Sequence, residues 1–324
     1  MRPRCTAILT AVFLMAAPLA ASVGAGFDPG ATYGTFTSNG VEMAFHRVGS
    51  TITNACDYDW WYGCWPTAAG MVMGHYDREG YAGQSYANLV PGGVAAEIET
   101  HYGPPTGWAA LVTNIIASQG HVDDFYSSSP APGSVVAYGI SGDDVPEPWH
   151  EFNCLADFMG ASQDACNGNV NGGASVYFYP SGEPLHWHEM PGHSLADVSG
   201  MYGIFEYIQH CGYDVTTLHN QYILGYASAT QGFTLEQYKA QIDAGRPVIV
   251  YVGNHAVCGV GYTDDDPNAI LVNDTWSGGP HRLVWGGSYS GLDHYGVTVL
   301  EIVPEPATLA LLGIGLIGLM RRKR

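Results

Sequence analysis

Three residues that lie far apart along the chain have the side chains that nucleophilic catalysis needs. Cys64, His255 and Asp274 together can break an acyl or amide bond. A thiolate attacks the carbonyl carbon, an imidazole takes up and later returns a proton, and a carboxylate fixes the tautomer and orientation of the imidazole. These residues form a site only if the fold brings them together, so the elements that carry them must be predicted next.

Cys64 lies at the start of a predicted helix. Apolar residues recur at helical spacing over 66–77, and Pro66 lies near the first turn, where its missing N–H costs nothing. The sulfur is then close to unpaired N–H groups and to the positive end of the helix dipole, so we expect a lowered pKa and a thiolate. Gly63 allows close backbone approach at this turn. The alternative is a buried structural or disulfide-bonded cysteine.

His255 and Asp274 lie on two successive predicted strands. The strand over 255–262 begins with His255, and the strand over 269–273 ends one residue before Asp274. A carboxylate at this position can accept a hydrogen bond from the imidazole. The alternatives are a core histidine and an ordinary aspartate at a strand end.

The remaining pattern predicts an α+β fold in which helices come first and a mostly antiparallel sheet comes last. Further helices are predicted over 106–119, 195–211 and 234–244, the last with a capping box formed by Thr234 and Gln237. Further strands are predicted over 247–252, 282–285 and 297–303. Residues 121–185 read as a loop-rich insertion.

These strings resemble the papain-like cysteine peptidases, in particular the branch related to the double-glycine peptidases that trim bacteriocin leaders. Gly63–Ala68 matches the Gly-Cys-x-Pro-Thr-Ala start of the nucleophile helix, and Gly245–Ile249 matches the strand before the base. Asp274 precedes a small residue and a tryptophan, as the third member does in that family, and Asn273 is the second choice for this member. The resemblance covers roughly 51–301. It implies a papain-like fold, in which a helical lobe with the nucleophile helix packs on a mostly antiparallel sheet lobe at the catalytic cleft.

The chain departs from this family at the oxyanion hole. Papain-like enzymes usually have a glutamine about six residues before the nucleophile, but residues 57–61 read Asp-Tyr-Asp-Trp-Trp. One oxyanion donor is worth about 10²–10³ in rate. The candidates to replace it, beside the backbone N–H of Cys64, are the Tyr58 hydroxyl and the indole N–H groups of Trp60 and Trp61.

Three functions therefore stay open. The first is an exported cysteine peptidase or amide hydrolase with a Cys64–His255–Asp274 triad and a peptide substrate. The second is a catalytically inactive papain-like binding protein of the cell surface or extracellular matrix, which the 21 tyrosines and 8 tryptophans would suit. The third keeps the triad but transfers the acyl group to an amine, as a transglutaminase does.

Both ends of the chain have the pattern of targeting signals. Residues 1–25 have a basic start, an apolar run and small residues, which predicts a signal peptide cut by signal peptidase. Residues 303–324 contain Pro-Glu-Pro, an apolar segment and four basic residues, and so resemble the PEP-CTERM sorting tail of Gram-negative bacteria, which an exosortase is thought to remove. We expect export across the inner membrane, transient anchoring by the tail, and release to the cell surface or medium. The peptidase domain would then span 26–302.

The net charge and the spacing of possible metal-binding residues limit which partners and cofactors we expect. Residues 26–303 contain 29 acidic and 5 basic side chains, a net charge of −24, which excludes nucleic-acid binding. His186, His188 and His193 lack the spacing of a helical zinc motif, and 264–268 fits a hairpin turn better than a calcium loop, so we expect no metal and no cofactor.

The cysteine count permits disulfide bonds. Cleavage of the signal peptide would leave six cysteines, enough for three bridges in an exported chain. Cys154 and Cys166 lie in the expected insertion and could staple it. Cys258, three residues after His255 on an apolar strand, is predicted to be a core residue.

Overall fold

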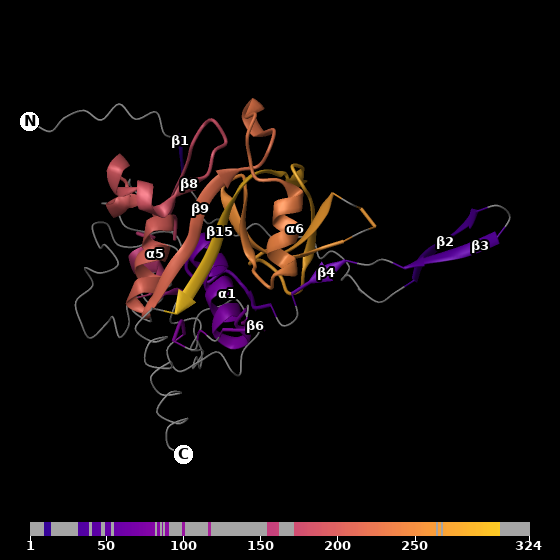
Figure 1. Cartoon of the computed structure of the whole chain (residues 1–324), viewed down its shortest axis with the longest axis horizontal. Helices are drawn as coiled ribbons and strands as arrows, with labels where there is room; N and C mark the ends of the chain where they lie inside the picture. The colour runs from indigo at the N-terminus through magenta and orange to yellow at the C-terminus, as the bar shows by residue number, and fades with distance from the viewer. Residues whose placement is uncertain are drawn as a thin grey trace, which may run out of the picture.

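The fold is α+β, as predicted, and its centre is a large antiparallel sheet (Figure 1). The computed structural model describes residues 10–13, 32–38, 41–46, 49–52, 55–81, 83–84, 86, 88–90, 99–100, 116–117, 154–161, 172–263, 265–266 and 268–304. Most of the predicted helix at 106–119 and the sorting tail after residue 304 lie outside these residues.

The main sheet has nine strands. Seven follow one path in the order β13-β12-β11-β10-β15-β9-β8, while β14 pairs with β15 and β4 pairs with β11. The strands are β4 (Ser50–Thr51), β8 (Leu185–His186), β9 (Tyr213–Tyr222), β10 (Val248–Val252), β11 (His255–Tyr262), β12 (Ala269–Asn273), β13 (His281–Val284), β14 (Ser288–Tyr289) and β15 (Leu292–Pro304). All of these pairs are antiparallel.

The alternation of side chains along the strands gives the sheet two buried faces. On β10, Ile249 and Tyr251 pack in the cluster that contains α1 (Cys64–Glu79) and α5 (Gly200–His210). Val248, Val250 and Val252 point the other way and pack with Tyr238 and Ile242 of α6 (Leu235–Asp243). The sheet is therefore the middle layer between α1 and α6.

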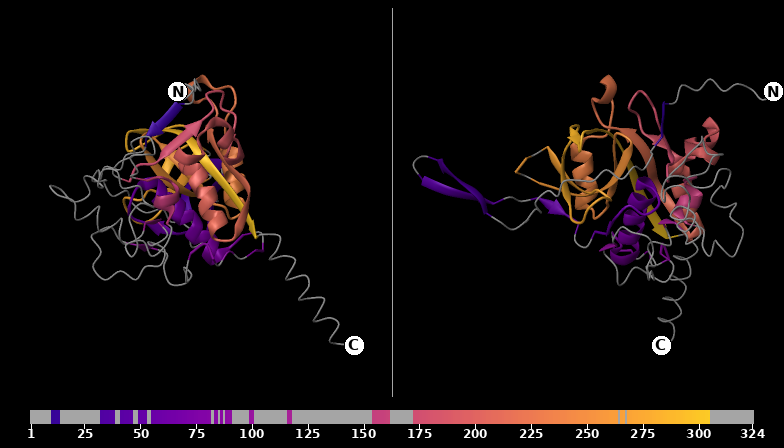
Figure 2. Two further views of the ribbon diagram at one scale, coloured as in Figure 1. Left: turned by 90° about the vertical axis from the view of Figure 1, so that its left-hand side faces the viewer. Right: turned by 180° about the vertical axis from the view of Figure 1, so that it is seen from behind.

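The first part of the described chain adds smaller elements. The strands β2 (Thr32–Ser38) and β3 (Val41–His46) form a separate hairpin that extends away from the sheet (Figure 2). The strand β5 (Asp57–Tyr58), just before α1, pairs in parallel with β6 (Glu99–Thr100). The strand β1 (Thr10–Phe13), within the expected signal peptide, pairs with β7 (Ser175–Phe178).

The expected insertion over 121–185 is more than loop. It contains α4 (Leu155–Phe158), which packs on α5, and β7, whose four residues are all buried. The carbonyl oxygen of Phe158 would lie only 1.9 Å from a Cβ added at Gly203, so the two helices are in close contact. These described parts of the range belong to the core.

The short 3-10 helices lie between the larger elements. They are η2 (Trp187–Glu189), η3 (Pro191–His193), η4 (Ala196–Val198) and η5 (Tyr226–Ser228). Three of them precede α5, so the helix predicted from residue 195 begins only at Gly200, with Ser199 as its N-cap. Among the described residues, no helix has the length and apolar character needed to span a bilayer.

Candidate active site

Cys64 is the first residue of α1, where the sequence placed it. The turn before it is tightly built: Gly63 has a φ of 111°, and a Cβ at this position would lie 2.1 Å from the carbonyl oxygen of Gly172. The hydroxyl of Thr67 donates to the carbonyl of Gly63 at 2.7 Å and accepts from the backbone N–H of Trp61 at 3.2 Å. The glycine is thus required by close approach of another backbone segment.

The sulfur of Cys64 is a free thiol and is buried, with 1% of the residue exposed. Burial raises the pKa of this thiol to about 11, although the backbone N–H groups of Ala256, Trp65 and Cys64 itself act in the opposite direction. The expected lowering of the pKa by the helix start is therefore wrong for this buried state. Desolvation of the thiolate outweighs the hydrogen-bond donors around it.

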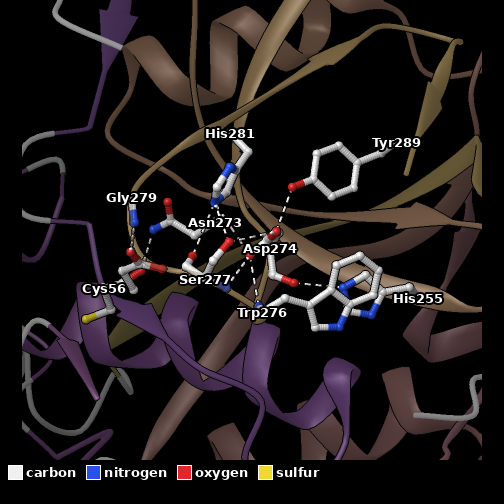
Figure 3. A network of polar contacts seen from close by, with 10 residues as sticks. Cys56, His255, Asn273, Asp274, Trp276, Ser277, Gly279, His281 and Tyr289 are labelled. Carbon is white, nitrogen blue, oxygen red and sulfur yellow. Dashed lines mark hydrogen bonds and ion pairs between the residues drawn. The ribbon is translucent and has the colours of Figure 1, made fainter. Parts of the chain in front are cut away.

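His255 is the first residue of β11 and lies opposite Val252 in the hairpin with β10. Its Nε2 lies 2.8 Å from the backbone carbonyl oxygen of Asp274, and its ring stacks on the indole of Trp276 with centroids 4.0 Å apart (Figure 3). Because a carbonyl oxygen only accepts, Nε2 carries the proton and Nδ1 is the basic nitrogen. Burial lowers the pKa of this imidazole to about 4, against a smaller raising effect of Asp274.

The carboxylate of Asp274 does not accept the imidazole proton, which differs from the expectation. Its Oδ1 accepts from the backbone N–H groups of Trp276 at 2.8 Å and Ser277 at 2.9 Å. Its Oδ2 accepts from the hydroxyl of Tyr289 at 2.6 Å (Figure 3). The carboxylate thus fixes the loop that carries both the carbonyl and the indole in contact with His255.

Asn273, the second choice for the same role, is also directed elsewhere. Its Nδ2 donates to the backbone carbonyl of Cys56 at 2.9 Å. Two further hydrogen bonds connect the same two segments. The N–H of Gly279 donates to Asp57 at 2.6 Å, and the N–H of Trp60 donates to the carbonyl of Thr275 at 2.5 Å. The chain just before Cys64 is therefore hydrogen-bonded to the loop that supports His255.

Cys64 contacts the strand of His255 through the residue that follows the histidine. The backbone N–H of Ala256, which follows His255, faces the sulfur of Cys64. Within the part of the chain that the structure describes, the sulfur and the imidazole do not share a hydrogen bond. In this state the thiol keeps its proton and the imidazole is neutral, because burial disfavours both charges.

The three oxyanion candidates belong to the same buried cluster as Cys64. Burial raises the pKa of the Cys56 thiol to about 11, and a hydrogen bond with the Tyr58 hydroxyl acts in the opposite direction, so this hydroxyl is engaged there. The backbone N–H groups of Trp60 and Trp61 are also used within the fold. That the indole N–H groups of these two tryptophans donate to the oxyanion stays a prediction.

Sequence reasoning missed the outer part of this network. Tyr289 comes from β14, and the indole of Trp276 stacks on it as well, with centroids 6.2 Å apart. His281 lies with Nε2 3.0 Å from the Ser277 hydroxyl and 3.7 Å from Oδ1 of Asp274. Polar residues that follow a strand-end aspartate were a signal for such a network, but nothing in their spacing singles out Tyr289.

Other residues noted in the sequence lie elsewhere. His186 pairs with His219 across β8 and β9, at the opposite end of the sheet path from β12, and its ring stacks on that of His188. The Cys154 thiol donates to Asp157 at 3.2 Å, and Cys166, named as its possible disulfide partner, lies outside the described residues. Cys258 is buried on β11, as predicted.

Comparisons with known proteins match two parts of the chain. Residues 194–285 match the model of the Peptidase_C39 like family, and residues 303–324 match the PEP-CTERM protein-sorting motif. Searches of curated proteins and of solved structures found no match. The family match supports the resemblance to papain-like peptidases and contains His255 and Asp274, while Cys64 lies before it. It suggests a cysteine peptidase, and the sorting motif implies export and recognition by an exosortase.

Proposed function

We propose that the chain is an exported cysteine peptidase or amide hydrolase in which Cys64 is the nucleophile and His255 is the general base and acid. The main observation for this proposal is that the imidazole of His255 is held in a fixed orientation. Its Nε2 is bonded to the Asp274 carbonyl and its ring is stacked on Trp276, next to the N–H that faces the sulfur. The match to the Peptidase_C39 like family supports the same reaction class.

The proposed reaction follows from which groups of the site carry a proton and which can accept one. Nδ1 of His255 takes the proton of the thiol as the sulfur attacks the carbonyl carbon of the substrate, so a resting thiolate is not required. The N–H of Cys64 and an indole of Trp60 or Trp61 would bind the oxyanion. His255 then protonates the leaving amine, and water hydrolyses the thioester. Asp274 acts through its carbonyl, which keeps the imidazole in the tautomer with a basic Nδ1.

We assign residues 26–302 to a papain-like domain in which the α1 side carries the nucleophile and the sheet carries the base. Residues 1–25 would direct export and be removed by signal peptidase. The tail at 303–324 would anchor the protein until the sorting enzyme releases it to the cell surface or medium.

A second candidate is a binding protein that has kept the fold without activity. The burial of Cys64 favours it: with 1% of the residue exposed and a pKa of about 11, the thiol is unreactive in the state described. A peptidase must uncover this sulfur when substrate binds, whereas a binding protein need not.

The test compares the chain with its Cys64→Ala and Cys154→Ser variants. Each protein is incubated with a peptide library, cleavage is read by mass spectrometry, and iodoacetamide labelling is followed from pH 6 to pH 10. A peptidase loses cleavage in Cys64→Ala and retains it in Cys154→Ser, and peptide speeds the labelling of Cys64. No cleavage, together with slow labelling that peptide does not change, would support the binding protein. Product formed with added amine instead of water would indicate acyl transfer.

A further inference from the structure

Two buried thiols lie close to the site but take no part in the proposed reaction. Cys56 lies eight residues before Cys64, and Cys258 lies three residues after His255 on β11. Each residue is 1% exposed, and both belong to the buried cluster that contains α1. Cys56 lies in the segment before α1, and Cys258 lies on β11. These two segments must stay in contact for Cys64 and His255 to lie in one site.

The hydrogen bonds of Asn273 bring these two cysteines together. Asn273 on β12 is the partner of Cys258 across the ladder, and opposite residues of an antiparallel pair point to the same face with Cα atoms about 4.5–5.5 Å apart. The Asn273 amide donates to the carbonyl of Cys56 at 2.9 Å. The backbone of Cys56 is therefore held over the pair formed by Asn273 and Cys258. Burial raises the pKa of the Cys258 thiol, and the nearby Cys56 thiol adds to this effect.

We propose that Cys56 and Cys258 form a disulfide bond in the exported protein and leave Cys64 as a free thiol. The structure describes the reduced form of the pair. In the reaction each thiol loses its hydrogen and one S–S bond forms. The two electrons and two protons pass to the disulfide of a thiol oxidant outside the cytoplasm, which is reduced to two thiols.

This bond would lock the approach to the nucleophile helix onto the strand that begins with His255. In the reduced form hydrogen bonds connect the same approach segment to the neighbouring strand β12 and the loop after it, including those of Asn273 with Cys56 and of Gly279 with Asp57. The bond closes a loop of roughly two hundred residues, and long loops give the largest entropic stabilisation. The proposal rests on export, not on catalysis, so it can be tested apart from peptidase activity.

The experiment isolates the full chain from an oxidising compartment of a bacterial host and digests it without reductant. We expect a cross-linked peptide that contains Cys56 and Cys258, which is lost in the variants Cys56→Ser and Cys258→Ser. The control Cys154→Ser should retain it, because a serine hydroxyl can still donate to Asp157. Reductant should lower the Tm of the parent protein and of this control by about 5–10 °C.

Two results would overturn the proposal. One is a parent protein in which both thiols can be alkylated after denaturation without reductant. The other is a cross-link from either cysteine to a different partner. Because the parent protein alone gives these results, misfolding of a serine variant does not affect the test. The link should also form in Cys64→Ala, so loss of activity and loss of the disulfide are separate outcomes.

Discussion

Nε2 of His255 is bonded to the backbone carbonyl of Asp274, at 2.8 Å, while the Asp274 carboxylate faces the other way. The residue therefore has two separate functions: its carbonyl orients the imidazole, and its carboxylate holds the loop. Thr275, the next residue, has a φ of 65°, which is rare for a β-branched side chain. A strained backbone next to a proposed catalytic histidine is a conformation that its surroundings must maintain.

This division predicts different results for two substitutions of Asp274. In Asp274→Asn the amide oxygen can still accept from Trp276 and Ser277, so we expect kcat/KM within about tenfold of the parent. If the carboxylate oriented the imidazole directly, the same change would cost about 10⁴ in kcat. Asp274→Ala leaves three donors without an acceptor and should lower stability by about 2–4 kcal/mol. Peptide cleavage and urea unfolding measure the two effects.

Tyr289 can be tested through its one hydroxyl. Tyr289→Phe removes the donor 2.6 Å from Oδ2 of Asp274 and leaves a buried carboxylate oxygen with a poorer set of partners. We expect a loss of about 1–3 kcal/mol in the free energy of unfolding and a lower kcat. The control is Tyr262→Phe, whose hydroxyl bonds to Asp243 at an exposed position and should change stability by under about 0.5 kcal/mol. Equal effects of the two variants would contradict the role of Tyr289.

The helix start predicts a third result. In Gly63→Ala the new Cβ would lie 2.1 Å from the carbonyl of Gly172, at a φ of 111°. We expect loss of activity and destabilisation by more than the roughly 1–3 kcal/mol that backbone strain alone costs. Gly212→Ala is the matched control, because that residue also has a positive φ, of 83°, but an added Cβ meets nothing within 4 Å. The difference between the two variants in thermal and urea unfolding measures the clash.

The sequence predicted the elements that have strong local signals. Pro66 and the apolar spacing predicted α1, the capping box of Thr234 predicted α6, and the β-rich runs predicted β10, β11 and β12. It missed β9, where polar and apolar residues are mixed, and β7, a buried run of four residues that is too short to show a period.

The site was predictable only in part, for a physical reason. Residue type and order identified Cys64, His255 and Asp274 as candidates, and the structure places His255 against Asp274. Which atom of Asp274 contacts the imidazole depends on the path of the loop, which is fixed by Tyr289 from a distant strand. The raised pKa of Cys64 depends on burial by segments far away in the sequence. Neither effect is encoded in local spacing.

Buried histidines predict how stability depends on pH. Burial lowers the pKa of His219 and His255 to about 4 and that of His294 to about 3. Between pH 6.5 and about 4 the unfolded chain therefore binds more protons than the folded protein, and stability falls as the pH falls. Each histidine contributes up to about 1.4 kcal/mol per pH unit in this window. Urea unfolding at pH 7.5, 6.5, 5.5 and 4.5 should show the decline, and it should be shallower in His219→Asn. His188→Gln, at an exposed position, should follow the parent, and a stability that stays level down to pH 4.5 would mean that these imidazoles are hydrated.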